Sequence, residues 1–221
     1  MKKIGIIGYG EIGQSLEKLY LGKDFVIQIN DTGLELDQIT SDVDVLNIAI
    51  PFTDQEKFVN IVSHYILDLE PKLTIIHSTI TPGTTLKVLS KLEGKHLVVH
   101  SPVRGIHPNL YEGLKTFTKF IGAATELAKV LSTTYYGLCI AFHDDMNKLC
   151  KEHNVKYEEV ATKWNKTYND GYNKLGMDNV IRPVLYPPKD GKIGGHCVVP
   201  NAELCKQFFD SLALDYIINL K

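Results

Sequence analysis

The chain has 221 residues, of which 44% are hydrophobic and 23% are charged, and its formal net charge is -2. This length suffices for one α/β domain and a smaller helical region, and the charge gives no reason to expect nucleic acid or an anionic membrane as a partner. No apolar run reaches the length of a membrane span, and four cysteines without CxxC spacing fit reduced thiols, so we expect a cytoplasmic protein.

Residues 1–122 alternate short apolar runs with amphipathic stretches. The β-branched runs predict strands at 3–7, 25–29, 43–50, 73–76, 96–100 and 117–121. Apolar spacings of three and four predict helices at 11–21, 54–67 and 82–92, the second opened by a capping box at Thr53 and the third by Thr81-Pro82. This alternation predicts a parallel sheet with helices on both faces.

The pattern changes after Gly122, where apolar spacings of three and four predict a long helix over residues 125–152. An alternative is a seventh strand at 138–142, with Gly137 as the turn before it. Further on, we predict a helix at 155–169, a loop at 171–194 and a last helix at 202–220 with Asn201 as its N-cap. The expected domains are therefore residues 1–122 and a helical region at 123–221.

A glycine motif, Gly8-Tyr9-Gly10-Glu11-Ile12-Gly13, lies between the first expected strand and the first helix. In this position Gly8 permits a tight turn, Gly10 lets a pyrophosphate approach the backbone, and Gly13 lets helix and strand pack closely. The six residues therefore predict a dinucleotide site. The expected fold class is α/β, a Rossmann-type doubly wound parallel sheet followed by a small helical region with a long helix. The alternative is a glycine turn in a sheet that binds no cofactor.

Asp31 lies just past the second expected strand, 18 residues after Gly13. A carboxylate there accepts hydrogen bonds from ribose hydroxyls and repels a 2′-phosphate. No arginine lies within several residues of it, so we predict NAD rather than NADP as the cofactor. Pro51, which ends the strand at 43–50, is a further candidate contact, and a plain surface aspartate is the alternative for Asp31.

Four runs together resemble the UDP-glucose/GDP-mannose dehydrogenase family, which includes UDP-N-acetylmannosamine dehydrogenases. They are Gly8-Tyr9-Gly10-Glu11-Ile12-Gly13, Ser78-Thr79-Ile80-Thr81-Pro82-Gly83-Thr84-Thr85, Ser101-Pro102-Val103-Arg104 and Gly194-Gly195-His196-Cys197. The runs follow the family's order and span nearly the whole chain. The family oxidises a nucleotide-sugar alcohol to a carboxylate in two NAD-dependent steps.

The resemblance implies that Cys197 is a nucleophile that adds to the aldehyde formed first, so that a second oxidation leaves a thioester for water to cleave. It implies that Lys129 stabilises the oxyanion and that Thr79 lies near a water and the nicotinamide, and Ser78 beside it is a further candidate cofactor contact. From the residues themselves, a thiolate beside His196 at the start of the last predicted helix is favoured by the helix dipole. A small buried thiol is the alternative for Cys197.

Arg104 and His107 follow the strand at 96–100, at the edge where α/β sheets bind ligands. Together with His196 they are candidates to contact a substrate anion, and a plain loop is the alternative. We expect no metal site, because an adjacent His and Cys cannot easily reach one ion and no second ligand pair has suitable spacing.

Three positions depart from the family's pattern: Val103 replaces a glutamate, Asn201 an aspartate and Thr133 an asparagine. General acid–base catalysis is worth roughly 10²–10⁴-fold in rate, so the lost carboxylates affect the expected mechanism. The chain also ends at Lys221, so we expect it to lack the second α/β domain that binds the nucleotide of the sugar in this family.

Three functional hypotheses follow. The first is an NAD-dependent oxidoreductase that oxidises a sugar or another small alcohol through a Cys197 thiohemiacetal and thioester. The second is a non-catalytic NAD-binding relative or partner subunit. The third is an enzyme of the 6-phosphogluconate or hydroxyacid dehydrogenase type, in which a helical lysine is the acid–base group and the Gly-Gly-His-Cys run has no role. The apolar stripe of the helix at 125–152 suits a homodimer, with packing inside one chain as the alternative.

Overall fold

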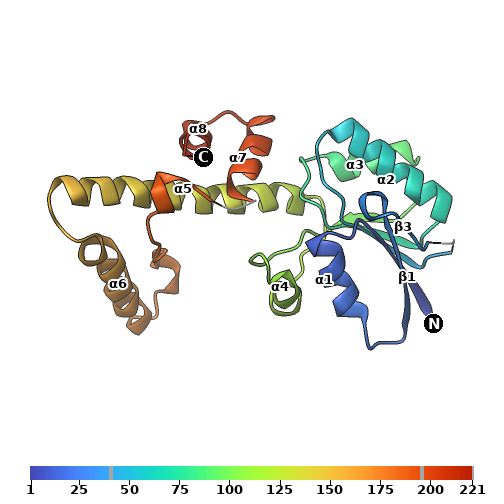
Figure 1. Ribbon diagram of the computed structural model, residues 1–221, viewed down its shortest axis with the longest axis horizontal. Coiled ribbons are helices and arrows are strands. Elements are labelled where there is room, and N and C mark those ends of the chain that lie inside the picture. Colours follow the sequence, from blue (N-terminus) through green and yellow to red (C-terminus); the bar gives the residue numbers. More distant parts are fainter. Residues whose placement is uncertain (40–41, 195–196, 221) are drawn as a thin grey trace. The chain divides into compact units, whose positions relative to one another are not determined.

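The computed structural model of the chain describes residues 1–39, 42–194 and 197–220 (Figure 1). They form two compact units, Met1–Lys129 and Val130–Lys221. Among the described residues, no helix has both the length and the apolar character needed to cross a membrane.

The first unit is an α/β fold around a six-stranded sheet of order β3-β2-β1-β4-β5-β6. Its strands are β1 (Lys2–Ile7), β2 (Phe25–Asp31), β3 (Leu36–Asp37), β4 (Val45–Ile48), β5 (Leu73–Ile76) and β6 (Val98–His100). All neighbours are parallel except β3, a two-residue edge strand antiparallel to β2. In this register Ile6 lies opposite Ile29 on one side and Asn47 on the other. The expected doubly wound Rossmann-type sheet is thus confirmed.

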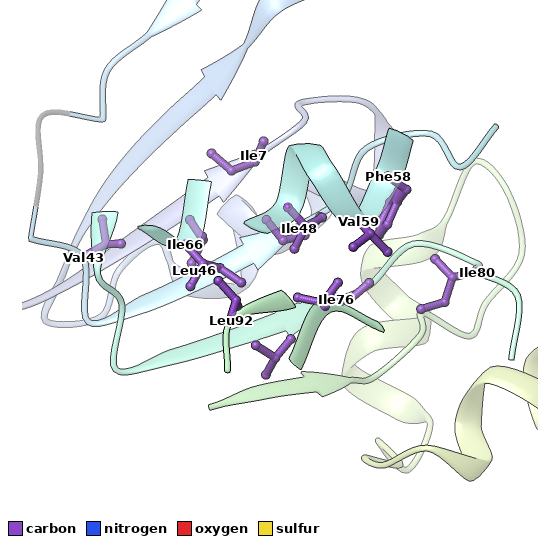
Figure 2. Packing of buried hydrophobic residues seen from close by; sticks show 13 residues of the cluster. Ile7, Val43, Leu46, Ile48, Phe58, Val59, Ile66, Ile76, Ile80 and Leu92 are labelled. Atoms are coloured by element: carbon purple, nitrogen blue, oxygen red, sulfur yellow. The ribbon is translucent and has the colours of Figure 1, made fainter. Parts of the chain in front are cut away.

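Helices cover both faces of this sheet (Figure 1). They are α1 (Glu11–Tyr20), α2 (Gln55–Leu69), α3 (Thr84–Lys91) and α4 (Leu110–Thr116). One apolar core lies between the sheet and the α2–α3 face, as Figure 2 shows for Ile48, Phe58 and Ile76. A second core, on the α1 face, contains Ile6 and Leu16. Central strands that are buried on both faces carry near-continuous apolar runs, and these runs predict their positions from the sequence.

The expected strand at 117–121 is wrong. This segment makes only isolated hydrogen bonds to the end of β6, from Gly122 N–H to His100 O (3.1 Å) and from Ser101 Oγ to Phe120 O (2.7 Å). A strand needs a continuous ladder, and Phe117 and Phe120 are instead exposed. Helix α4, which the sequence analysis missed, lies just before this segment.

Two helix starts also differ from expectation. Asp54, rather than Thr53, is the N-cap of α2, and its Oδ1 accepts the Lys57 N–H at 2.8 Å. Helix α3 begins at Thr84 with Gly83 as its N-cap, so Pro82 precedes the helix. Gly83 has φ +86°, a left-handed conformation that glycine adopts without strain.

The long helix is confirmed as α5 (Ala124–Glu152), and the alternative strand at 138–142 is wrong. Gly137 lies inside α5, where an added Cβ would be 2.4 Å from Val198 Cγ1. This glycine therefore allows close helix packing and forms no turn. The expected helix at 155–169 is observed as a π-helical turn, η2 (Glu158–Thr162), followed by α6 (Lys163–Lys174). The expected loop that follows it contains two short 3-10 turns, η3 (Asp178–Val180) and η4 (Lys189–Gly191).

The single last helix expected at 202–220 is wrong, because two helices are present: α7 (Val198–Lys206) and α8 (Leu212–Ile218). Asn201 lies inside α7, whose N-cap is Cys197. The second helix has its own cap, since Ser211 Oγ accepts the Ala213 N–H at 3.3 Å.

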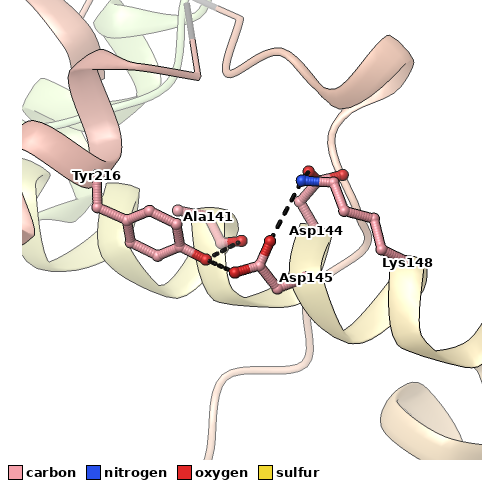
Figure 3. A network of polar contacts seen from close by, with 5 residues as sticks. All are labelled: Ala141, Asp144, Asp145, Lys148 and Tyr216. Carbon is pink, nitrogen blue, oxygen red and sulfur yellow. Dashed lines mark hydrogen bonds and ion pairs between the residues drawn. The ribbon is translucent and has the colours of Figure 1, made fainter.

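Apolar and polar contacts hold α7 and α8 to α5. The apolar core of this unit contains Ala141 of α5, Ala202 of α7 and Ile217 of α8. Figure 3 shows the polar contacts: the Tyr216 hydroxyl donates to Ala141 O (3.1 Å) and to the Asp145 carboxylate. Lys148 bonds Asp145 (3.2 Å) and the buried Asp144 (2.8 Å). Helix α8 is therefore anchored to the middle of α5 by both kinds of contact.

Candidate functional site

The glycine turn between β1 and α1 has the geometry that a diphosphate site requires. Gly8 has φ +91°, and an added Cβ would lie 2.6 Å from Ala49 O. At Gly13 an added Cβ would lie 2.1 Å from Gly8 O, so only glycine lets α1 pack this close to the turn. At Gly10, by contrast, an added Cβ would meet no described atom within 4 Å. The two outer glycines are thus required by packing, whereas Gly10 borders open space.

Gly10 is also the N-cap of α1, and no side chain caps this helix. The first N–H groups of a helix and the positive end of its dipole form a binding site for anions. An uncapped N-terminus beside open space therefore fits the diphosphate of a dinucleotide. Ile12, in the first turn of α1, packs against the α1-face core and so helps to hold the helix against the sheet.

Glu11, the first residue of α1, forms an ion pair with His107 through its Oε2 and the imidazole Nδ1. The side chains are 35% and 39% exposed. The structure thus brings together a residue predicted to contact the cofactor and one predicted to contact substrate. The Glu11 carboxylate lies at the helix end that attracts anions, and the His107 imidazole contacts it there.

Asp31, at the end of β2, accepts three backbone hydrogen bonds. Its Oδ2 accepts the Tyr9 N–H (2.6 Å), and its Oδ1 accepts the N–H groups of Gly33 (2.9 Å) and Leu34 (3.0 Å). These bonds, that from Tyr9 most of all, hold the pKa of Asp31 below its usual value. Each carboxylate oxygen can accept more than one hydrogen bond, so Asp31 remains able to bind ribose hydroxyls.

The predicted residues after β4 and β5 lie at the same edge of the sheet, because the carboxyl ends of parallel strands meet there. Pro51 is exposed in the loop after β4, and Thr79 is half-buried in the loop after β5. Ser78 is buried, and its Oγ donates to Ile50 O at 2.6 Å, which joins the two loops. Ligands of open α/β sheets bind outside this edge.

A buried polar chain, missed by the sequence analysis, runs beneath this edge. Asn47 Nδ2 donates to Gly5 O (3.2 Å), and Asn47 Oδ1 lies 2.9 Å from His77 Nε2. His77 Nδ1 lies 3.0 Å from Ser101 O and 3.3 Å from the Lys119 ammonium nitrogen. Burial, together with the Lys119 charge, lowers the pKa of His77 to about 3, so the ring is neutral at physiological pH.

Two lysines bind consecutive carbonyl groups after β6. Lys119 Nζ donates to Ser101 O (2.6 Å) and Pro102 O (3.1 Å), and Lys129 Nζ donates to Val103 O (2.8 Å). Desolvation, and then the Lys129 charge, lower the pKa of Lys119 to about 8. Lys119 stands out in the sequence only as a cation between two phenylalanines, a pattern that by itself does not distinguish it from a surface lysine.

Glu126, also missed, is a buried carboxylate at the start of α5, 1% exposed. It accepts hydrogen bonds from the N–H groups of Gly83 (2.5 Å) and Thr85 (2.9 Å) and from Thr85 Oγ1 (2.5 Å). These donors lie at the N-terminus of α3, where a negative charge is favourable. Glu126 thus fixes the start of α5, three residues before Lys129, to the loop that follows Ser78 and Thr79.

The Arg104 guanidinium lies over two aromatic rings, 5.0 Å from the centroid of Phe117 and 5.8 Å from that of Phe120. These cation–π contacts orient its side chain along the segment that precedes α5. Arg104 and His107 follow β6 as expected, and of the two the structure pairs His107 with the glycine motif.

In the second unit, Cys197 is a half-buried free thiol at the N-cap of α7. Its backbone carbonyl accepts the Asn201 N–H at 3.0 Å. The predicted contact His196 lies outside the described residues. No group of three or more His, Cys, Asp or Glu side chains that could hold a metal ion occurs within residues 1–39, 42–194 and 197–220.

No protein-family model matches the chain, and no curated protein sequence is similar to it. Solved structures do share its fold at 16% sequence identity or less. UDP-D-ManNAc dehydrogenase from Pyrococcus horikoshii is 16% identical with a TM-score of 0.78, over 99% of this chain and 68% of that one. Mycobacterium tuberculosis 3-hydroxyisobutyrate dehydrogenase with L-serine is 14% identical with a TM-score of 0.72, over 99% and 92%. Psf3 in complex with NADP+ is 12% identical with a TM-score of 0.55, over 98% and 92%.

Proposed function

We propose that this chain is an NAD(P)-dependent oxidoreductase that oxidises a CH–OH group of a small molecule. The observation that carries the proposal is the N-terminus of α1, which no side chain caps and which borders open space at Gly10. Gly8 and Gly13, on either side of it, are positions where only glycine fits. The fold is that of solved dehydrogenases. Because Asp31 is a carboxylate held ionised at the end of β2, and a carboxylate repels a 2′-phosphate, we expect NAD to be preferred over NADP.

The cofactor, when bound, supplies the hydride acceptor, and the residues of the chain hold it and move the proton. The backbone of Tyr9 and Gly10 and the first turn of α1 would contact the diphosphate, and Asp31 the ribose. Pro51, Ser78 and Thr79 would face the nicotinamide half. Lys129, held at Val103 O, is the candidate to stabilise the developing negative charge on the substrate oxygen or to take its proton.

Cys197 is the proposed nucleophile of a second oxidation. Its sulfur would add to the aldehyde carbon, and the oxygen would gain the thiol proton, to form a thiohemiacetal. A second equivalent of the oxidised cofactor, when bound, would supply the acceptor for the hydride of that carbon, and loss of the hydroxyl proton would leave a thioester. Water would then release the acid and the thiol. The support is the resemblance to thiol-using dehydrogenases and the position of Cys197, a half-buried free thiol at the N-cap of α7. Arg104, His107 and His196 are the proposed substrate contacts.

A second candidate is an oxidoreductase that uses Lys129 for acid–base chemistry and has no thiol step. The likeness to 3-hydroxyisobutyrate dehydrogenase, which spans 92% of that chain, favours this alternative. Cys197→Ser separates the two mechanisms when reduced cofactor formation is measured on a panel of sugar nucleotides, sugars and hydroxyacids. The control is Cys139→Ser, a second partly exposed thiol.

The thiol mechanism predicts that Cys197→Ser loses the second equivalent of reduced cofactor per substrate, whereas Cys139→Ser behaves as wild type. Unchanged stoichiometry and rate in Cys197→Ser would exclude it and leave the Lys129 mechanism. If no substrate yields reduced cofactor but the cofactor still raises the Tm, the chain is a cofactor-binding module without catalysis. If neither NAD nor NADP binds, the proposal fails.

We further propose that α5 mediates a homodimer. Its residues Leu131, Tyr135, Phe142 and Leu149 form one stripe by helical spacing, and they are 43%, 64%, 59% and 55% exposed. A second copy of the same stripe is a suitable cover for this apolar surface. Sedimentation should show a dimer that Tyr135→Glu with Phe142→Glu converts to a monomer. A wild-type monomer at about 100 μM, in the range where standard-size interfaces are occupied, would contradict the dimer.

A further inference from the structure

Lys119 is a cation that its surroundings keep in one place. Its ammonium donates to Ser101 O (2.6 Å) and Pro102 O (3.1 Å), and its third contact is His77 Nδ1 at 3.3 Å. Two of its three N–H donors are thus used by carbonyl groups, and the His77 ring lies against the ammonium. The ammonium is held by groups of the protein, and its effect on a ligand acts through its fixed charge.

This charge lies at the carboxyl edge of the sheet, on the side of β5 and β6. His77 directly follows β5, and Ser101 directly follows β6. A dinucleotide on this fold has its diphosphate at the α1 N-terminus and its first ribose at the end of β2, so its nicotinamide half extends across the crevice toward β4, β5 and β6. Lys119 is thus on the nicotinamide side of the candidate site, opposite Asp31.

The two redox states of the cofactor differ in charge at this end, because the oxidised nicotinamide ring is a cation and the reduced ring is neutral. A fixed positive charge nearby repels the first and leaves the second unaffected. We propose that Lys119 is a positioning cation that makes the site bind the reduced cofactor more tightly than the oxidised one. This inference rests on the proposed function, since it needs a nicotinamide cofactor in the site.

The other charged and titratable groups around Lys119 do not produce the same pH dependence. They are His77 after β5, His100 in β6, Arg104 after β6, and Glu126 and Lys129 in α5. Burial lowers the pKa values of both histidines, so they stay neutral above about pH 7. Arg104 keeps its charge throughout this range. The Glu126 carboxylate accepts hydrogen bonds from the N-terminus of α3. The contribution of the Lys129 charge is measured separately, with the variant Lys129→Met.

The Lys119 charge itself changes in an accessible range, because desolvation lowers its pKa to about 8. The ammonium is therefore mostly present at about pH 7 and mostly absent at about pH 9.5. The preference for reduced cofactor should fall over the same range. Binding of the oxidised cofactor near pH 8 should release a fraction of a proton, because a second cation disfavours the charged lysine.

The test measures Kd for oxidised and reduced cofactor, by calorimetry and by NADH fluorescence, at about pH 7 and about pH 9.5. For wild type we expect a ratio of oxidised to reduced Kd that is about tenfold larger at the lower pH, the size expected for repulsion between like charges at a partly buried site. Lys119→Met should show the smaller ratio at both pH values. Lys119→Arg keeps a charge that does not titrate here, so it should show the larger ratio at both.

Lys115→Met is the matched control, because Lys115 lies on the exposed side of α4 in an ion pair with Glu112. It should behave as wild type, and Lys129→Met should lower the ratio without removing its pH dependence. A wild-type ratio that does not change with pH, or one that Lys119→Met leaves intact, overturns the inference while the cofactor site stands. If neither redox state binds any variant, the proposed function itself has failed.

Discussion

Asn201 Nδ2 donates a hydrogen bond of 2.8 Å to Thr133 Oγ1, which joins α7 to α5 four residues after Cys197. These are two of the positions at which the chain departs from the dehydrogenase family it resembles, where an aspartate and an asparagine are expected. The two departures are therefore in direct contact in this chain. The bond also fixes the first turns of α7, at whose N-cap Cys197 lies.

A double-mutant cycle tests this contact. Asn201→Ala and Thr133→Val should each lower the free energy of unfolding by about 1–2 kcal/mol, because Asn201 is only 7% exposed and loses its side-chain hydrogen bond. Their coupling energy, measured by urea denaturation, should be about 1 kcal/mol. Additive effects would show that the two side chains are energetically independent.

The glycine turn offers a matched pair of substitutions. Gly13→Ala places a Cβ 2.1 Å from Gly8 O, so we expect a loss of about 2 kcal/mol or more in unfolding free energy. Gly10→Ala meets no described atom within 4 Å and should leave the Tm nearly unchanged, but it should weaken NAD binding by at least tenfold, or about 1.4 kcal/mol. Wild-type affinity in Gly10→Ala would place the diphosphate elsewhere.

Asp31 is expected to contribute both to stability and to binding. Because its folded pKa lies below the usual 3.8, its stabilising effect is present above that pH and is lost as the pH falls through the folded value. Acid unfolding of wild type should therefore be steeper below about pH 4 than that of Asp31→Asn. The same variant should narrow the preference for NAD over NADP, which calorimetry at neutral pH would measure. If the stability of both proteins depended on pH in the same way below about pH 4, Asp31 would have no such role in stability.

Glu126 should be among the most sensitive positions of the first unit. Glu126→Ala leaves the N–H groups of Gly83 and Thr85 and the Thr85 hydroxyl without their acceptor, and we expect a loss of about 3 kcal/mol. Thr85→Val removes one of the three donors and should cost about 1 kcal/mol. Thermal denaturation compares them, with the exposed Glu112→Ala as the control that stays near wild type.

His77 predicts a separate acid transition. Its pKa is lowered to about 3 in the folded state, so the unfolded chain binds a proton that the folded chain does not between about pH 6.5 and 3. The free energy of unfolding should decrease as the pH falls through that window, by on the order of 4 kcal/mol at its lower end. In His77→Gln, which should be less stable at neutral pH, this dependence on pH should be weaker. In the exposed His64→Gln it should be the same as in wild type. Equal slopes in all three proteins would exclude His77 as the cause.

Five strands of the sheet follow from apolar runs, and α5 follows from apolar spacing over many turns. The short edge strand β3 was not predicted, and the apolar run at 117–121 forms no strand. The close approach of Gly13 to Gly8 O, five residues earlier, is a local feature that residue type and spacing are enough to predict. The constraint on Gly8 comes instead from Ala49 O, which follows β4.

The polar interior beneath the site required the tertiary structure. Lys119, His77 and Glu126 bind groups 17 to 43 residues away, and most of those groups are backbone atoms, whose positions residue type does not reveal. At Asn201 the local sequence gave a wrong prediction for the same reason, because a long-range contact decides the structure there. Its local context predicts an N-cap, but α7 already begins at Val198, which packs against Gly137 of α5.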